Sequence, residues 1–154
     1  MMQEVEIVEY TPEYAQFFKL VNEGWITRHF TMEASDYKSL DHPQEYILDK
    51  GGYILIALYQ KEPVGACALI KMDAHTFELA KMAVSPAAQG KGIGLILGKA
   101  IIEKARQAGA KRLYLESNSI LKPAISLYHK LGFSTVTGVS SPYERCDIQM
   151  ELAL

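Results

Sequence analysis

The chain has 154 residues, 49% hydrophobic and 22% charged, with a net charge of -2 at pH 7, so we expect one globular domain over 1–154 with a sizeable core. The small negative charge argues against a nucleic-acid partner. We expect no signal peptide, and no apolar run reaches the roughly 18 residues that a membrane span needs. Its 2 cysteines and 4 scattered histidines are too few for a disulfide scaffold or a cysteine-based zinc site, so we expect a cytoplasmic protein that binds no metal.

The first half of the sequence predicts a strand, helical segments and a three-stranded meander. Residues 5–10 alternate apolar and acidic side chains, as a half-buried strand does. Thr11 and Pro12 provide an N-cap and first-turn pair for a helix that runs toward Trp25. Short helical turns are expected in 31–48. Three apolar runs separated by turns then predict antiparallel strands at 53–59, 64–72 and 77–84.

The second half predicts alternating helices and strands. Apolar residues repeat every four positions along 92–108, and Gly109 follows, as at the end of an amphipathic helix. After a strand at 112–117, Pro123 begins a second helix that Gly132 ends. Closing strands are expected at 133–139 and 146–152. The predicted order is β-α-α-β-β-β-α-β-α-β-β.

A glycine-rich loop, QGKGIG at 89–94, lies between the third meander strand and the first of these helices. It is not a Walker A loop, because Gly92 stands after Lys91 where Ser or Thr would bind Mg²⁺. It is not a dinucleotide fingerprint either, because Leu95 occupies the last small-residue position. The remaining pattern, Q-x-x-G-x-G before a helix, predicts a cradle of backbone N–H groups for a diphosphate, with Lys91 adding a positive charge. A simple tight turn is the alternative, but it needs only one glycine.

Two stretches resemble the GCN5-related N-acetyltransferase (GNAT) superfamily. FELAKMAVSPAAQGKGIG (77–94) is similar to its central motif, whose glycine loop holds the pyrophosphate of coenzyme A, and AISLYHKLGF (124–133) is similar to its A-x-x-L-Y-x-k-x-G-F segment. The resemblance implies an α/β (α+β) fold, the GNAT acyl-CoA N-acyltransferase fold, with a central mixed, mostly antiparallel sheet flanked by helices. LESNSILKPAISLYHKLGF with YERCDIQMEL is similar to a bacterial subgroup that also occurs fused to MarR-type regulators. No DNA-binding half is expected, because the first strand begins at the start of the chain.

The resemblance implies acetyl-CoA as cosubstrate. The third meander strand is expected to separate from its neighbour near Met82–Val84, so that free backbone groups of Met82 and Val84 bind the pantetheine arm and one N–H points at the thioester oxygen. The implied cofactor-binding residues are Met82, Ala83, Val84, Gln89, Gly90, Lys91, Gly92, Ile93, Gly94, Leu95, Asn118, Tyr128 and Lys130, with Lys122 as an alternative to Lys130 for the phosphates. Asn118 departs from the family spacing, and it contacts the pantetheine or substrate or else bonds its own turn.

The resemblance also implies two catalytic residues. Tyr128 matches the family's tyrosine that donates a proton to the leaving sulfur, and a phenol with a pKa near 10 is protonated at pH 7. Glu78 matches a glutamate that draws the proton from the amine through water. The alternatives are that Tyr128 is a core aromatic of an amphipathic helix and that Glu78 is a solvated strand carboxylate.

Family acceptors enter between the first two helices and the last strands. The expected substrate-binding residues there are Trp25, His29, Glu33, Tyr143 and Arg145, with Arg28, Asp36 and Asp147 as further candidates. Aromatic side chains with both signs of charge suit a zwitterion such as an amino acid, with Arg145 or Arg28 on its carboxylate. The alternative is that these residues belong to the core or the ordinary surface.

These features predict an acetyl-CoA-dependent N-acetyltransferase that moves an acetyl group to a primary amine by direct transfer in a ternary complex, on a small molecule or an amino acid. Two alternatives remain: a protein lysine or N-terminal acetyltransferase, and a non-catalytic acyl-CoA-binding sensor. The oligomeric state is open, with a homodimer through the C-terminal strands as one alternative because family members often pair in that way.

Overall fold

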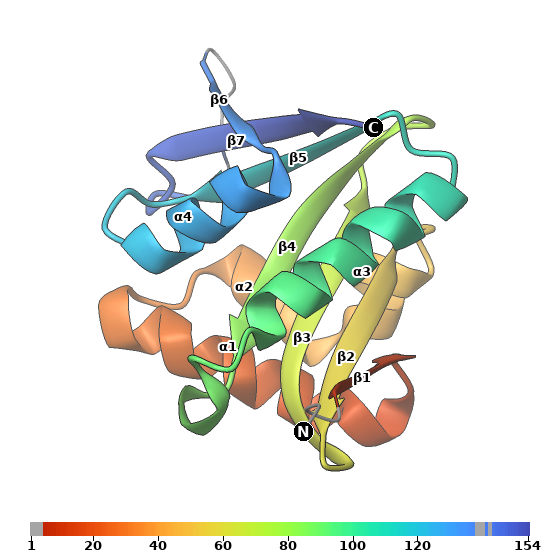
Figure 1. Cartoon of the computed structure of the whole chain (residues 1–154), viewed down its shortest axis with the longest axis vertical. Coiled ribbons are helices and arrows are strands. Elements are labelled where there is room, and N and C mark those ends of the chain that lie inside the picture. The colour runs from red at the N-terminus through yellow and green to blue at the C-terminus, as the bar shows by residue number, and fades with distance from the viewer. Residues whose placement is uncertain (1–4, 138–140, 142) are drawn as a thin grey trace.

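The computed structural model describes residues 5–137, 141 and 143–154, and it is built around a seven-stranded sheet (Figure 1). The strands follow the order β1-β2-β3-β4-β5-β7-β6 across the sheet. They are β1 (Val5–Glu9), β2 (Tyr53–Tyr59), β3 (Glu62–Lys71), β4 (Thr76–Val84), β5 (Arg112–Ser117), β6 (Ser134–Val136) and β7 (Ile148–Ala153). Neighbours pair antiparallel except β4 and β5, which are parallel. This mixed, mostly antiparallel sheet confirms the predicted fold class.

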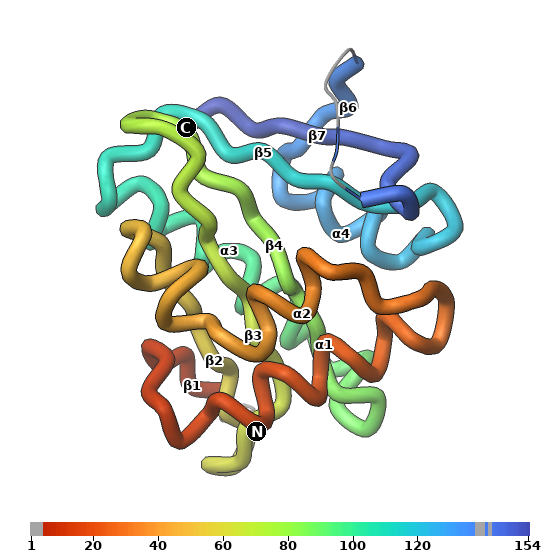
Figure 2. Tube along the Cα trace, turned by 180° about the vertical axis from the view of Figure 1, so that it is seen from behind, coloured from red at the N-terminus to blue at the C-terminus, as the bar shows by residue number. Residues whose placement is uncertain are grey.

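Helices cover both faces of the sheet. They are η1 (Pro12–Tyr14), α1 (Ala15–His29), α2 (Ala34–Asp41), η2 (Gln44–Leu48), η3 (Pro86–Ala88), α3 (Ile93–Gln107) and α4 (Lys122–Leu131). Figures 1 and 2 show α3 and α4 on one face and α1 and α2 on the other. No described helix combines the length and the apolar character that crossing a membrane requires.

The strands form two hydrophobic layers because successive side chains point to opposite faces. On β2, for example, Leu55 joins the cluster beneath α3, whereas Ile54 and Ile56 join the cluster beneath α1. The four-residue repeat predicted along α3 is buried in the first cluster: Ile93, Leu97, Ile101 and Ala105. Full burial of each large aliphatic side chain contributes about 1.5–3 kcal/mol to folding.

β4 contains a bulge at Lys81 and Met82, which together lie opposite Cys67 of β3. Lys81 takes a positive φ of 52°, a conformation that side chains other than glycine adopt rarely. The extra residue reverses the alternation of side chains along β4. Leu79 and Met82 pack beneath α3, whereas Lys81 faces α2 on the other side of the sheet.

β4 and β5 separate along their length. They pair at Thr76, Phe77 and Glu78 of β4, and the two strands then diverge, as Figure 1 shows. The separation therefore begins before Met82–Val84, where we expected it. β5 continues along β7, whereas β4 continues along β3 and is bent by its bulge, because a bulge increases the local twist of a strand.

The order of the elements agrees with the prediction, and the differences are local. Thr11 and Pro12 take the expected N-cap and first-turn positions, but the hydroxyl of Thr11 donates to the Glu13 carboxylate at 3.1 Å and does not cap a backbone N–H. The region 31–48 forms α2 and a π-helical turn rather than several separate turns. The last hairpin is shorter than predicted, with β6 limited to Ser134–Val136; positions 138–139 of the predicted strand lie outside the described residues.

Candidate functional site

The glycine loop that follows β4 has the geometry of an anion cradle. Gly90 and Gly92 take positive φ values of 83° and 77°, and a Cβ at either position would meet no atom within 4 Å. Gly92 is the N-cap of α3 and provides no side-chain hydrogen bond to the first turn. The first N–H groups of α3 therefore have no partner from a capping side chain, and they form the positive end of the helix dipole. Gly94 has a packing role, since its Cβ would lie 3.3 Å from Leu127 of α4.

The loop has two polar side chains, those of Gln89 and Lys91. The Gln89 amide donates to the carbonyl of Val84 at 3.1 Å, which fixes the loop to the end of β4. The Lys91 ammonium lies 5.6 Å from the centre of the Tyr59 ring. Lys122 and Lys130 are exposed on α4. Residues 89–92 of the loop are themselves exposed, so the loop is open to a ligand.

Tyr128 extends from α4 into the hydrophobic layer beneath α3. Its ring packs edge-on against Phe133, with the centroids 6.1 Å apart. Burial raises the pKa of the phenol above its ordinary value, and the nearby Cys67 thiol adds to that effect. Cys67 lies opposite the β4 bulge. The phenol is thus held protonated on the α4 side of the bulge, in the state that a proton donor requires.

Glu78 lies on β4 at the last position where β4 pairs with β5. Burial and then the neighbouring Glu116 carboxylate raise its pKa to about 7, whereas Lys81 acts in the opposite direction. Glu116 itself accepts hydrogen bonds from the hydroxyls of Tyr114 at 2.6 Å and Ser141 at 2.8 Å. A carboxyl group with a pKa near 7 is able to accept and release protons at neutral pH.

Asp36 is the centre of a buried ionic cluster on the same side of the sheet. Its carboxylate accepts two hydrogen bonds from the Arg145 guanidinium, at 2.7 and 2.6 Å, and one from the Lys81 ammonium at 2.6 Å. The backbone N–H of Glu33 donates a fourth, at 2.9 Å, as part of the capping box that begins α2. Asp36 is 0% exposed and Lys81 is 8% exposed. The four bonds saturate the carboxylate, so Asp36 orients the two cations.

The charges in this cluster stabilise one another. Burial opposes ionisation of Asp36, but the hydrogen bonds and charges of Arg145 and Lys81 outweigh it and lower the pKa of Asp36 to about 2. Burial lowers the pKa of Lys81, and Asp36 limits that decrease. Tyr143 completes the cluster: its hydroxyl accepts from Lys81 at 3.2 Å, and its ring centre lies 4.4 Å from the Arg145 guanidinium.

The structure brings together four of the residues expected to bind the acceptor. The Arg145 guanidinium contacts Tyr143, lies 6.0 Å from the centre of the Trp25 ring, and donates to Glu33 at 3.3 Å. His29 is not part of this group: it is exposed at the end of α1, with its ring 6.1 Å from that of Phe30.

Asn118 and Asp147 support loops near the cluster. Asn118 accepts from the N–H of Ile120 at 2.9 Å and donates to the carbonyl of Arg145 at 2.6 Å. It therefore bonds its own turn, one of the two expected alternatives, and also holds the Arg145 segment. Asp147 accepts from the backbone and hydroxyl of Ser119, both at 2.8 Å.

Lys81 is the residue that the sequence analysis missed. In an unbroken strand its side chain would share a face with Leu79 and lie beneath α3. The bulge places it with Glu78 and Asp36 instead. A lysine among the apolar residues of a predicted core strand is the signal that would have identified it.

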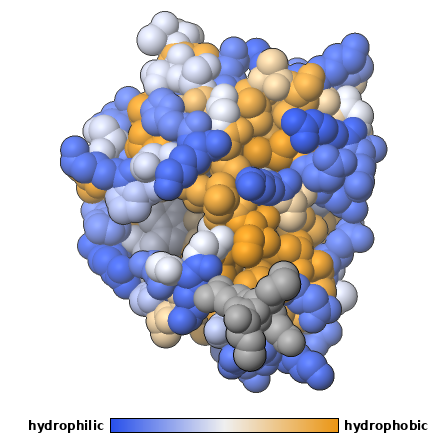
Figure 3. Space-filling view, viewed as in Figure 1, coloured by the Kyte–Doolittle hydropathy of each residue, from blue (hydrophilic) through white to orange (hydrophobic). Residues whose placement is uncertain are grey.

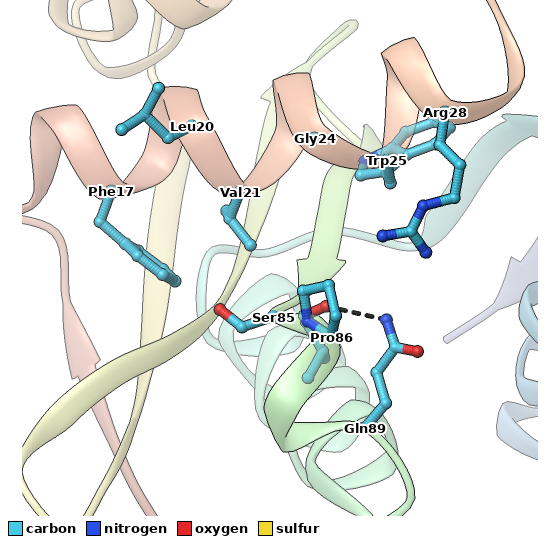
Figure 4. Close-up of a pocket in the computed structure, with 10 residues that line it drawn as sticks. Phe17, Leu20, Val21, Gly24, Trp25, Arg28, Ser85, Pro86 and Gln89 are labelled. Carbon is cyan, nitrogen blue, oxygen red and sulfur yellow. Dashed lines mark hydrogen bonds between the residues drawn. The ribbon is translucent and has the colours of Figure 1, made fainter.

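A groove lies beside this cluster, between α1 and the turn from β4 to α3 (Figure 4). Its volume is about 270 Å³. The lining from α1 is Phe17, Leu20, Val21, Gly24, Trp25 and Arg28, and the turn contributes Val84, Ser85, Pro86 and Gln89. The face of the molecule seen in Figure 3 carries a band of hydrophobic residues bordered by hydrophilic ones. Within the described residues, no group of three or more His, Cys, Asp or Glu side chains is arranged to hold a metal ion.

Comparison with known proteins gives consistent results. Residues 14–133 match the Acetyltransferase (GNAT) family. The uncharacterized N-acetyltransferase YjgM of Escherichia coli (strain K12) is 35% identical over 101 residues, which are 64% of this chain and 60% of that protein, so the chain spans about three-fifths of this relative's length.

Two solved structures share the fold. A GNAT-family acetyltransferase from Staphylococcus aureus Mu50 superposes with a TM-score of 0.88 at 18% identity, over 97% of this chain and 99% of that one. YncA from Salmonella typhimurium, whose structure contains acetyl-CoA, has a TM-score of 0.77 at 20% identity, over 97% and 93% of the two chains.

Proposed function

Because the chain belongs to the acetyltransferase (GNAT) family, we propose that it transfers an acetyl group from acetyl-CoA to a primary amine, directly and within a ternary complex. The observation that carries the proposal is the path of β4. This strand leaves β5 after Glu78 and ends at the glycine loop, with Tyr128 beside its bulge. One strand thus connects a diphosphate cradle, a gap in the sheet and two groups able to transfer protons.

The cradle fits the diphosphate of coenzyme A. Gly90 and Gly92 direct no side chain into the space above the loop, and the uncapped first turn of α3 offers N–H donors there. Lys91 adds a positive charge. Among the described residues, β4 has no strand partner on its β5 side beyond Glu78, so Met82 and Val84 are able to bond the pantetheine arm.

The residues around β4 supply the chemistry of transfer. The nitrogen of the amine attacks the thioester carbonyl carbon, the new C–N bond forms, and the C–S bond breaks. Glu78 takes a proton from the amine, directly or through water, and Tyr128 gives its proton to the departing thiolate. A backbone N–H near Met82 stabilises the oxyanion while it forms. General acid and base groups of this kind each contribute about 10²–10⁴ to the rate.

The acceptor lies, in this proposal, on the α1/α2 side of β4, where Lys81, Arg145 and Tyr143 converge on Asp36. We favour a small molecule or an amino acid over a protein lysine or N-terminus, because that side offers a groove of about 270 Å³ and a buried polar cluster. A sensor that binds acyl-CoA without catalysis is the second candidate, and it would need neither the raised pKa of Glu78 nor the buried phenol of Tyr128.

The test begins with thermal melts in the presence of acetyl-CoA, CoA, ATP or NADH. A ligand at 100 times its Kd stabilises the protein by about 2.7 kcal/mol, which for this size raises Tm by roughly 5–10 °C. We expect the rise with acetyl-CoA and CoA alone. Release of free thiol from acetyl-CoA with a panel of amines and lysine peptides then separates enzyme from sensor. A rise with ATP or NADH, or with none of the four, would overturn the proposal.

A further inference from the structure

The groove between α1 and the end of β4 is suited to an apolar side chain. Phe17, Leu20, Val21 and Trp25 line one wall, and Val84 and Pro86 line the other. Leu20 is 52% exposed, so this wall presents apolar surface to solvent. In Figure 4 the side chains of Phe17 and Val21 point from α1 toward Ser85 and Pro86 across the groove.

Gly24 enlarges this groove. It lies in the interior of α1, where glycine is less favourable than alanine by about 1 kcal/mol. Packing does not require it, because a Cβ at this position would meet no atom within 4 Å. The missing side chain therefore leaves open space along the wall of the groove.

Trp25 lies between the groove and the polar cluster. It lines the groove and also lies 6.0 Å from the Arg145 guanidinium, while Val84 is the last residue of β4. An acceptor whose body lies between α1 and Pro86 would thus have its amine beside β4.

The cations near the amine differ in their availability. Arg145 and Lys81 are both bonded to Asp36, and Arg145 also contacts Glu33. Arg28 is exposed at the groove, and it has no ion pair with any residue that the structure describes. Figure 4 shows Arg28 and Gln89 extending toward the same end of the groove. Arg28 is therefore the guanidinium able to bind an anion there.

Building on the proposed function, we propose that the acceptor is an amine with an apolar body and a neighbouring carboxylate, of the kind found in an apolar amino acid. Its body occupies the groove, and Arg28 binds its carboxylate. The sequence offered two arginines for the carboxylate, Arg28 and Arg145. The structure assigns this role to Arg28, because Arg145 already donates two hydrogen bonds to Asp36.

Matched acceptors test the proposal in the unaltered protein. L-phenylalanine has the body and the carboxylate, phenethylamine lacks only the carboxylate, and glycine lacks only the body. We expect kcat/KM from thiol release to be at least about tenfold higher for phenylalanine than for either of the others. Equal or higher values for phenethylamine would overturn the role of the carboxylate, and equal or higher values for glycine would overturn the role of the groove.

Two variants locate the contacts. Arg28→Gln should raise KM for phenylalanine by about tenfold or more and leave phenethylamine unchanged. Gly24→Leu, which keeps a good helix former in α1, should lower kcat/KM for phenylalanine by about tenfold and leave L-alanine nearly unchanged. The assignment would be overturned if Gly24→Leu lowered kcat/KM equally for phenylalanine and alanine. It would also be overturned if Arg28→Gln raised KM equally for phenylalanine and phenethylamine.

Arg28 also lies near Gln89 of the diphosphate loop, so a contact with the cofactor is the rival source of an anion. The Kd of acetyl-CoA, measured by calorimetry without acceptor, distinguishes the two. An unchanged Kd in Arg28→Gln supports the acceptor carboxylate, and a tenfold weaker Kd assigns Arg28 to coenzyme A and overturns the proposal. If the unaltered protein does not bind acetyl-CoA at all, the proposed function fails first.

Discussion

Arg145 donates two hydrogen bonds, of 2.7 and 2.6 Å, to the two carboxylate oxygens of Asp36, although 109 positions separate these residues in the sequence. The contact joins α2 to the segment that precedes β7. Lys81 joins the same carboxylate from the β4 bulge. Three parts of the chain that surround the proposed acceptor site are therefore fixed to one buried carboxylate.

Replacing Asp36 should strongly destabilise the protein. Asp36→Asn keeps the shape of the side chain but leaves Lys81 and Arg145 buried without their counter-charge. Removing one partner of a buried ionic cluster costs about 3–5 kcal/mol, which corresponds to a fall in Tm of roughly 10 °C or more. Asp41→Asn is the control, because Asp41 pairs with Lys19 at the surface, where an ion pair contributes about 1 kcal/mol or less. Equal melting temperatures for the two variants would contradict the structural role of Asp36.

The same residue predicts a loss of stability in acid. The pKa of Asp36 is about 2 in the folded protein and lies below its ordinary value of 3.8. A carboxyl group with a depressed pKa contributes stability above its unfolded-state pKa, and that contribution disappears as the pH falls through the folded-state value. Asp36 should therefore account for about 2 kcal/mol that is lost between about pH 4 and pH 2. Urea denaturation across this range should show a shallower pH dependence in Asp36→Asn, and equal slopes would exclude the contribution.

The sequence predicted much of this architecture, but not the centre of the cluster. The periodicity of α3 and the glycine at each helix end depend on neighbours within one or two turns, so local patterns predict them correctly. The bulge at Lys81 depends on how β4 pairs with β3, and its local trace in the sequence is a lysine among the apolar residues of the strand, which does not by itself give the register. For the same reason, the early separation of β4 from β5 was predicted too late along the strand.

The residues that we expected to bind the acceptor illustrate the same limit. Trp25, Glu33, Tyr143 and Arg145 were chosen by residue type and by their expected elements, and they do lie together. His29 was chosen in the same way and lies apart, because the last turn of α1 directs it toward solvent. Residue type predicted four side chains that lie together, whereas the exclusion of His29 from this cluster needed the direction of each side chain.

Glu78 should produce a titration near pH 7 in the rate. Its pKa is raised to about 7 by burial and by Glu116, so the base is ionised only above this pH. The kcat/KM for the amine should rise with pH and reach half of its plateau near pH 7, because this parameter reports groups of the free enzyme. Glu78→Gln should remove this rise of kcat/KM with pH. Glu116→Gln should move its midpoint to lower pH, since a neighbouring negative charge is removed. An unchanged profile in Glu78→Gln would assign the proton to another acceptor.

Glu78 also affects stability, with the opposite sign to Asp36. A carboxyl group with a raised pKa favours the folded state below its unfolded-state pKa, and this contribution is lost as the pH rises through the folded-state value. Glu78→Gln should therefore be more stable than the unaltered protein above about pH 7 and lose that advantage below about pH 4.5. Chemical denaturation at pH 5 and pH 8 measures the difference, whether or not Glu78 takes part in the reaction.

Removal of the Tyr128 hydroxyl should slow the transfer and preserve the fold. Tyr128→Phe keeps the ring that packs against Phe133. If the phenol protonates the leaving sulfur, kcat should fall by about 10²–10⁴ with the Kd of acetyl-CoA little changed. Tyr53→Phe is the control, because the Tyr53 ring packs on Phe77 in the same hydrophobic layer, near the start of β4 rather than beside its bulge. Turnover that is unaffected in Tyr128→Phe would leave this residue with a packing role alone.

The two ends of α3 offer a matched test of the anion cradle. Gly92 precedes the helix with a φ of 77°, Gly109 follows it with a φ of 87°, and a Cβ at either position would meet no atom within 4 Å. Alanine at either position should therefore cost a similar amount of stability, about 1–2 kcal/mol, because only the backbone conformation is strained. Acetyl-CoA is expected to contact the N–H groups beside Gly92 and nothing near Gly109. Gly92→Ala should thus weaken acetyl-CoA binding by about tenfold or more, whereas Gly109→Ala should leave the Kd unchanged. Calorimetric titration of both variants makes the comparison, and equal affinities would mean that the diphosphate does not lie on this loop.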